Sequence, residues 1–445
     1  MKGMKIYFFS ALLINLILAF DLDVGAQEKK IEKTYSWAYA ANKDVKMTFN
    51  NYDCDLVIHT WDKSTIEYKM TLDATLRSEE DAKRLDGYIE GLEFSHSAGS
   101  VEFNNRFWQS RKSMMGKKTL DLKGEKTIRY SDFNMSGELW IPAGCNLVLS
   151  SKYSGIELED INGTASFTLY NDKLYGGNVN NYLSIEAKYS TIELKAVKDV
   201  AADLYNTDLE TSSMGNLSIE SKYSKVRTGD AANITINSYS DRYSFGNTGN
   251  IKFTDKYSDL KAEVSRDLIL DCYNSTVSIA GMNNVDLLSK YGKYELDSVT
   301  NLHISSCYSD NFQVQSIQTL NVSESKYCTY KLGQLSSQLL LKEGYSDKFF
   351  ITGTPADFKG IKVNGKYINI EMAVDEALNY RFKASLKYPK LDIDEESMDV
   401  KIKILESSQL EMEATKGTVT EGMAEFVVNG YDVALTFTTP SQSLY

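Results

Sequence analysis

The sequence predicts an all-β protein built around a single-stranded parallel β-helix, or β-solenoid, with about 17 residues per rung. Two observations predict this fold: apolar residues recur at a nearly fixed step across residues 146–351, and they come in i, i+2 pairs, the spacing of a half-buried strand. The composition agrees, because proline is scarce at 4 residues and tyrosine abundant at 29, which suits a chain of strands. A rung of this size cannot bury its apolar side alone, so stacked rungs are expected to share one core.

Each rung has two apolar positions that keep the same step. The first position falls at Leu147, Ala165, Leu183, Val200, Leu217, Ile234, Ile251, Leu268, Val285, Leu302, Leu320 and Leu339. The second falls at Ile156, Leu174, Ile192, Leu209, Val226, Tyr243, Leu260, Val277, Tyr294, Phe312, Tyr330 and Phe349. Each rung is therefore predicted to hold two short strands, and the gaps between them, rich in Ser, Asn, Asp and Gly, are predicted to form corners.

A second rhythm has a period of two rungs and indicates the length of one coil. Lys-Tyr pairs stand before the second strand of every other rung, at Lys152-Tyr153, Lys188-Tyr189, Lys222-Tyr223, Lys256-Tyr257, Lys290-Tyr291 and Lys326-Tyr327. In the rungs between them, a tyrosine stands in register with those lysines. If one coil is one rung, lysines and tyrosines alternate along the stack and the lysines lie about 9.6 Å apart. Because a two-rung coil would place the lysines about 4.8 Å apart, where they repel, we predict the single-rung coil.

The repeated tyrosines and aspartates are the candidate site residues. The tyrosine row can be a stack that pins strand register, or an exposed stripe that binds a glycan; its candidate members are Tyr170, Tyr205, Tyr239 and Tyr273. The corner aspartates are first of all turn formers, with a weak calcium-binding row as the alternative; the candidate ligands are Asp241, Asp259, Asp310 and Asp347.

The first 26 residues are predicted to be a secretory signal peptide. Lys2 and Lys5 precede an apolar run over residues 6–20, and Val24-Gly25-Ala26 offers a small-residue cleavage site. Cleavage would leave no membrane span. The mature chain is expected in the periplasm, at the outer-membrane surface or outside the cell.

Two further domains are predicted to flank the solenoid. Residues 27–145 indicate a β-rich capping domain, with residues 55–61 and 65–72 as adjacent strands and one helix N-capped by Ser78. A basic stretch at residues 107–118 is expected to be a solvated loop. Residues 352–445 indicate an antiparallel β cap, formed from residues 360–370, 400–405, 409–413 and 431–437. Such caps would cover the unpaired ends of the stack.

Charge and cysteine content exclude several classes of function. The net charge of −12 argues against binding nucleic acid or an anionic bilayer. Five cysteines are too few and too irregular for a disulfide framework, so we expect them to be buried and incidental. Cys272 and Cys307 would lie two rungs apart, too far for a bridge. No zinc-ligand spacing occurs, and no cofactor is predicted.

Catalysis is not predicted. Some parallel β-helices cleave acidic polysaccharides, but they need a cluster of carboxylates in a groove, placed off the repeat. Here the carboxylates recur with the repeat, and hydroxyl-nucleophile, phosphate-binding and dinucleotide-binding motifs do not occur.

Several segments together resemble the bacterial putative adhesin family over about residues 31–351. They are Trp61-Asp-Lys-Ser-Thr-Ile-Glu67, the helix at residues 78–92, Glu138-Leu-Trp-Ile-Pro-Ala-Gly-Cys-Asn-Leu-Val-Leu149 and the Lys-Tyr-Ser-x-Ile-x-Leu rungs. This chain has Tyr-Ser where many members place Gly-Asp at the corner. The resemblance implies a β-solenoid exported to the cell envelope with an adhesive role, and it supplies no catalytic motif.

The function expected from the sequence is therefore that of a non-enzymatic, exported, adhesin-like or structural envelope protein. The alternatives are a glycan-binding module that uses the tyrosine stripe, or an accessory protein in envelope-stress signalling. The expected partner is a surface glycan or an envelope protein, not nucleic acid, and the protein is expected to be a monomer.

Overall fold

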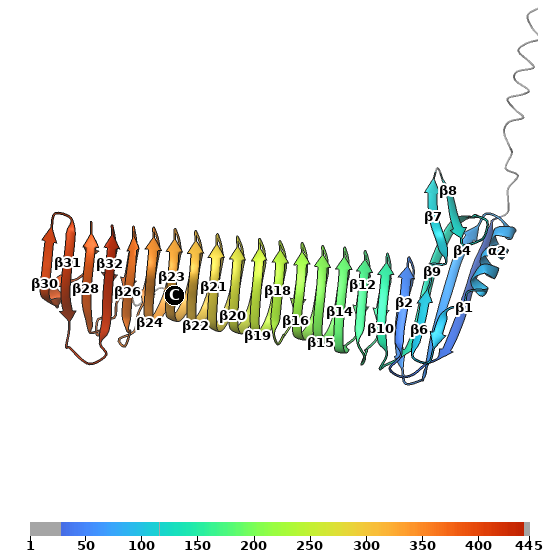
Figure 1. Ribbon diagram of the computed structural model, residues 1–445, viewed down its shortest axis with the longest axis horizontal. Coiled ribbons are helices and arrows are strands. Elements are labelled where there is room, and N and C mark those ends of the chain that lie inside the picture. Colours follow the sequence, from blue (N-terminus) through green and yellow to red (C-terminus); the bar gives the residue numbers. More distant parts are fainter. Residues whose placement is uncertain (1–27, 115, 440–445) are drawn as a thin grey trace, which may run out of the picture.

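The computed structural model describes residues 28–114 and 116–439, which form one long stack of parallel strands with a different cap at each end (Figure 1). The stack is an all-β solenoid of about 13 turns with roughly 18 residues per turn. The predicted signal peptide, residues 1–26, lies outside the described residues. No helix in the described part of the chain has the length and apolar character needed to cross a membrane.

The central rungs pair in the register that the apolar repeat predicts. Leu147 pairs with Ala165, and Ala165 with Leu183, while Ile156 pairs with Leu174 in the second strand. The strands of this region are β10 (Asn146–Lys152), β11 (Gly155–Leu158), β12 (Ala165–Tyr170), β13 (Lys173–Gly176), β14 (Val179–Lys188), β15 (Thr191–Tyr205), β16 (Asp208–Lys222), β17 (Lys225–Thr228), β18 (Ile234–Tyr239), β19 (Arg242–Lys256), β20 (Asp259–Tyr273), β21 (Thr276–Lys290), β22 (Lys293–Tyr308), β23 (Asn311–Lys326), β24 (Thr329–Tyr345) and β25 (Lys348–Gly353). Because each strand pairs with the next rung, one coil is one rung, as predicted.

Each rung has a third inward-facing side that the sequence analysis assigned to a corner. Val197 pairs with Met214, and Met282 with Val299, in segments that continue from the second strand of one rung into the first strand of the next. This is why β15, β16 and β19 to β24 are 15 to 17 residues long. The gap after the second strand thus carries one buried residue per rung, which closes the core on its third side.

The core runs the length of the stack and contains an internal aromatic column. Tyr294, Phe312, Tyr330 and Phe349 stack face to face in successive rungs, with centroid separations of 4.9, 4.8 and 4.4 Å. All four side chains are fully buried. Offset stacking adds to the burial of the rings and fixes the register of these rungs.

The N-terminal end combines the first rungs with an antiparallel sheet and one helix. Its elements are β1 (Lys29–Ala40), β2 (Lys46–Tyr52), β3 (Asp55–Trp61), β4 (Thr65–Leu76), α2 (Glu79–Glu90), β5 (Ser95–Ser97), β6 (Ser100–Asn104), β7 (Trp108–Met114), β8 (Lys117–Leu122) and β9 (Ile128–Pro142). The strands β2 and β3 pair in parallel with β10 and β11, so they already form a rung. The helix begins where predicted, since the Asp81 backbone N–H donates to Ser78 Oγ at 3.1 Å.

Two local expectations for this end were wrong. The strands β3 and β4 are not adjacent, because β9 pairs in parallel with β3 and antiparallel with β4 and so lies between them. The basic stretch at residues 107–118 is not a loop but the hairpin of β7 and β8. Arg111 anchors this hairpin: it pairs with Asp53, and its Nε donates to Tyr130 Oη at 2.7 Å.

The C-terminal end continues the parallel stack before an antiparallel hairpin covers it. Its elements are β26 (Gly360–Lys366), β27 (Asn369–Ala373), β28 (Tyr380–Lys387), β29 (Lys390–Asp392), the short 3-10 helix η1 (Glu395–Ser397), β30 (Met398–Glu406), β31 (Gln409–Lys416), β32 (Ala424–Tyr431) and β33 (Ala434–Thr438). Of the segments expected to be antiparallel, residues 400–405 and 409–413 are antiparallel, in β30 and β31. Residues 360–370 and 431–437 instead lie in parallel rungs, and β32 inserts between β26 and β28.

Candidate ligand-binding surface

One corner of the stack carries a continuous row of tyrosine rings, here called the tyrosine ladder. Each ring contacts the next at a centroid separation of 5.3 to 5.8 Å and an interplanar angle of 72 to 84°. This edge-to-face geometry is one that aromatic pairs prefer. In spatial order the members are Tyr52, Tyr153, Tyr170, Tyr189, Tyr205, Tyr223, Tyr239, Tyr257, Tyr273, Tyr291, Tyr308, Tyr327, Tyr345, Tyr367, Tyr431 and Tyr388.

Two backbone arrangements bring the rings into this single row. In rungs of the Lys-Tyr class the tyrosine itself has a positive φ, for example 65° at Tyr257. In the other class the tyrosine ends its strand and the next residue has the positive φ, 54° at Asn274 after Tyr273. The four predicted stripe residues, Tyr170, Tyr205, Tyr239 and Tyr273, all belong to the second class and are 36 to 37% exposed.

The sequence analysis assigned four tyrosines to the stripe and missed that the tyrosines of the Lys-Tyr pairs join the same row. The tyrosines of the Lys-Tyr pairs fill every space between the four predicted residues, because the left-handed corner turns their rings into the same row. The available signal was the tyrosine after each of those lysines, at a position that a turn residue normally occupies.

Lysines alternate with tyrosines beside the ladder, as the single-rung coil predicts. Lys222 pairs with Tyr239, which pairs with Lys256, and Lys256 pairs with Tyr273. At the first rung of the repeat, Lys152 Nζ lies 5.7 Å from the centroid of the Tyr170 ring. The lysines of this row thus recur on alternate rungs beside the ladder, about 9.6 Å apart along the stack.

A shallow groove of about 820 Å³ follows this surface in the middle of the stack. Two exposed rows line it, one with Lys222, Tyr239, Lys256, Tyr273 and Lys290, and the other, two residues earlier on the same strands, with Glu220, Asn237, Thr254, Asp271 and Leu288. Two of the four predicted stripe residues, Tyr239 and Tyr273, therefore line the groove. Their neighbours offer cationic donors on one side and carboxylate or amide groups on the other.

Cationic side chains lie over the terminal rings at both ends of the ladder. At the N-terminal end, Tyr52 contacts Trp108 edge to face, and the Arg106 guanidinium lies 4.7 Å from the Tyr52 ring. At the C-terminal end, Lys387 Nζ lies 5.5 Å from the Tyr388 ring and 5.9 Å from the Tyr431 ring. Cation–π contacts at both ends leave the exposed tyrosine edges between them as the accessible part.

The predicted metal residues do not come together at one place. Asp241, Asp310 and Asp347 are buried and point into the stack, whereas Asp259 lies on the outside, 3.8 Å from Arg242. Each inward carboxylate accepts N–H bonds from two directions. For Asp347, the Cys328 N–H donates at 2.8 Å from the preceding rung, and the Tyr345 N–H donates at 3.1 Å from its own. The inward carboxylates therefore accept hydrogen bonds from backbone N–H groups at the corners of the stack.

The inward aspartates belong to a buried row of polar corner residues, here called the polar seam. Its members are Ser154, Asp172, Ser190, Thr207, Ser224, Asp241, Ser258, Ser275, Asp310, Cys328 and Asp347. Burial raises the pKa of Asp172, Asp310 and Asp347 to about 6, although the N–H donors oppose this shift. Asp255, a strand residue beside the seam, has its pKa raised to about 6 by the same cause. The sequence analysis predicted corners at these positions but not the burial of their side chains, because Ser and Asp are usually exposed.

Comparisons with known proteins give similarity to solved structures alone. No protein-family model matches the chain, and no curated protein matches it. A putative adhesin from Parabacteroides merdae is similar over 59% of this chain and 96% of its own, with 10% identity and a TM-score of 0.27. A putative cell adhesion protein from Clostridium sporogenes covers 92% of this chain and 99% of its own, with 9% identity and a TM-score of 0.17. A putative adhesin from Parabacteroides distasonis covers 72% and 95%, with 13% identity and a TM-score of 0.21. These solved structures carry the same kind of description as the family that the sequence resembles.

Proposed function

We propose that this protein is a non-enzymatic, exported protein of the adhesin type, which uses the tyrosine ladder and its lysine row to contact an extended partner at the cell envelope. The observation that supports this most directly is the continuity of the ladder. On one face, an aromatic edge repeats on every rung and a lysine on every second rung. A long partner therefore meets the same chemistry many times.

The chemistry of the surface favours a polar polymer over an apolar partner. Twelve of the ladder rings are 36 to 50% exposed, and hydroxyls and lysines surround them. Partly exposed aromatic rings beside hydrogen-bond donors suit the apolar faces and hydroxyls of sugars. A surface glycan is therefore the proposed partner class, and the groove beside Tyr239 and Tyr273 is the proposed place of contact.

A purely structural role is the second candidate, and the ladder itself favours it. Each edge-to-face pair adds about 0.5–1.5 kcal/mol beyond its buried area. A row of this length could therefore exist only to hold the rungs in register. The two candidates differ in whether the exposed ring edges bind anything.

A glycan array separates the two candidates. Wild-type protein should bind a restricted set of glycans, and the triple variant Tyr205→Ala, Tyr239→Ala, Tyr273→Ala should lose that binding while circular dichroism still reports a folded β protein. The matched control is Tyr175→Ala with Tyr182→Ala, because both rings are 45% exposed but lie outside the ladder. Absence of binding by the wild-type protein, or equal loss in the control, would leave the structural role as the better account.

A further inference from the structure

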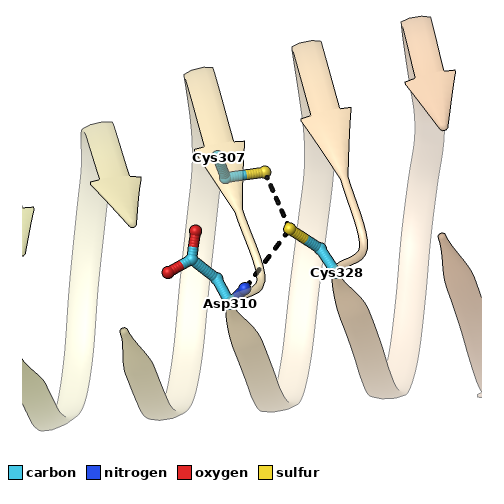
Figure 2. A group of neighbouring side chains, drawn as sticks. All are labelled: Cys307, Asp310 and Cys328. Atoms are coloured by element: carbon cyan, nitrogen blue, oxygen red, sulfur yellow. Dashed lines mark hydrogen bonds between the residues drawn. The ribbon is translucent and has the colours of Figure 1, made fainter. Parts of the chain in front are cut away.

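Two buried thiols face each other across neighbouring rungs. Cys307, near the end of β22, and Cys328, just after β23, have their Sγ atoms 3.5 Å apart (Figure 2). Their exposed fractions are 2% and 1%. The other three cysteines, Cys54, Cys145 and Cys272, are buried in other rungs.

The rung geometry, not chance, brings these two positions together. In several rungs the side chain near the end of a strand contacts the polar-seam residue of the next rung, 20 or 21 residues later. Ser289 Oγ donates to Asp310 at 2.8 Å, Ser221 Oγ to Asp241 at 2.9 Å, and Ser151 Oγ to Asp172 at 3.1 Å. Cys307 and Cys328 occupy the same two positions, 21 residues apart. The pairing of Cys307 with Ser325 and the left-handed corner at Tyr327 fix both sulfur atoms in the core.

The surroundings of the pair favour a sulfur–sulfur bond over a metal. Cys307, Asp310 and Cys328 lie close enough for one ion, and two thiolates with a carboxylate would suit a metal such as zinc. However, the Asp310 carboxylate points away from the sulfur atoms (Figure 2). It accepts hydrogen bonds from the Gly292 N–H at 2.5 Å, Ser289 Oγ at 2.8 Å and the Tyr308 N–H at 2.9 Å. Of Asp310, the backbone N–H and not the carboxylate faces Cys328 Sγ, at 3.4 Å. The other neighbours of the two sulfur atoms are neutral groups: Tyr330 Oη lies 3.1 Å and Ser325 Oγ 3.4 Å from Cys307 Sγ, and the Lys326 carbonyl lies 3.3 Å from Cys328 Sγ.

We propose that Cys307 and Cys328 form a disulfide bond that links two successive rungs of the solenoid in an oxidising environment. Two S–H bonds break and one S–S bond forms. The two protons and two electrons pass to a disulfide oxidant, such as oxidised glutathione or a protein disulfide, which is reduced to two thiols. Because both sulfur atoms are buried once the rungs close, the oxidant reacts while this part of the stack is still open. The bond closes a loop of about one rung and thereby restricts the unfolded chain.

In the closed stack, the contact between the sulfur atoms raises the pKa of Cys307 and lowers the pKa of Cys328. This contact is absent while the rungs are open, so it does not decide which thiol reacts first. One thiol attacks the oxidant in the open stack, and the other then resolves the mixed disulfide.

Trypsin separates the two cysteines, which makes the bond directly measurable. Cleavage after Lys293, Lys326 and Lys331 places Cys307 in peptide 294–326 and Cys328 in peptide 327–331. The full chain is refolded in a mixture of reduced and oxidised glutathione, its remaining thiols are alkylated under denaturing conditions, and the digest is analysed without reduction. The two peptides should appear linked, lighter by two hydrogen atoms than their sum, and should separate on reduction.

Two variants and a metal measurement complete the test. Cys272→Ser should keep the linked pair, because Cys272 holds the position equivalent to Cys307 two rungs earlier. Cys307→Ser should abolish it and lower the melting temperature by several degrees under oxidising conditions. Recovery of both wild-type peptides as alkylated thiols would overturn the proposal. One zinc ion per refolded chain, with the thiols protected from alkylation, would overturn it as well.

Discussion

At the corner beside the tyrosine ladder, one residue per rung has a positive φ, and its identity alternates between tyrosine and a small polar residue. Tyr257, at 65°, is followed one rung later by Asn274, at 54°. Left-handed backbone costs most side chains roughly 1–2 kcal/mol and costs asparagine less. In the tyrosine rungs, the edge-to-face contacts of the ladder offset part of that cost. The alternation therefore keeps a ring on every rung without placing glycine at the left-handed position of these corners.

Asn274 allows the backbone cost to be measured apart from the ladder. Its side chain is exposed, and its backbone N–H donates a hydrogen bond to the Lys290 carbonyl at 2.8 Å. Asn274→Ala should lower the free energy of unfolding by about 1 kcal/mol, because alanine disfavours positive φ. Asn274→Gly should have little effect, since glycine adopts this backbone freely. Urea denaturation of both variants checks this, and equal destabilisation by Ala and Gly would contradict it.

At the scale of strands and rows, the polar seam couples the stability of the stack to pH. Burial raises the pKa of three of its aspartates, Asp172, Asp310 and Asp347, to about 6, above the ordinary value of 3.8. The folded state therefore binds more protons than the unfolded state between these two values. The stabilisation that protonation gives is fully present below pH 3.8 and is lost as the pH rises through about 6.

Replacing Asp310 isolates the contribution of one seam carboxyl. Five other corners of the seam carry serine, so Asp310→Ser installs a residue that this row accommodates. The change in the free energy of unfolding between pH 4.5 and pH 7.5 should differ from that of the wild type by about 2 kcal/mol. Asp310→Asn should shift this pH-dependent change by the same amount, although its absolute stability will differ. Variants whose pH dependence runs parallel to that of the wild type would disprove the account.

How far the sequence predicts these rows depends on whether a position repeats within the stack. The i, i+2 pairs and the 17-residue step predict the register, the single-rung coil and the alternation of lysine with tyrosine. They do not reveal the third inward side, because its residues vary from Met214 to Ser265 and one residue per rung sets no period-2 pattern. The direction of the corner aspartates also escaped prediction. The residue directly after the left-handed corner residue faces inward, and the one after that faces outward. Asp241 directly follows the left-handed Ser240 and is buried, whereas Asp259 comes one place later, after the inward Ser258.

At the scale of the whole molecule, the ends of the stack were the least predictable parts. The rung formed by β2 and β3 pairs with β10 and β11, but the elements from β4 to β9 separate the two rungs in the sequence. The apolar step of the repeat is therefore interrupted, and the sequence does not show that β2 and β3 form a rung. At the other end β32 lies between β26 and β28, so the order of strands in space departs from the order in the chain. No local pattern encodes such an insertion, because each strand on its own has the same alternation as any other rung.

The last strand of the stack, β30, is an edge that charge protects from association. It lies at the C-terminal end of the stack (Figure 1), and among the described residues it pairs with β31 alone. It exposes Val400, Ile402 and Ile404. Free edges with apolar side chains recruit further strands, and lysines on an edge oppose this. Lys401 and Lys403 alternate with the three aliphatic residues.

Removing both lysines should convert this edge into an association site. Lys401→Val with Lys403→Val should produce concentration-dependent oligomers in size-exclusion chromatography with light scattering, while the melting temperature of the dilute protein changes little, because both side chains are exposed. The matched control, Lys252→Val with Lys261→Val, removes two exposed lysines from β19 and β20, which pair on both sides, and should leave the oligomeric state unchanged. If both double variants associate equally, general loss of charge is the cause. Association of the β30 variant alone would instead locate the effect at the open edge, where main-chain N–H and C=O groups have no partner strand.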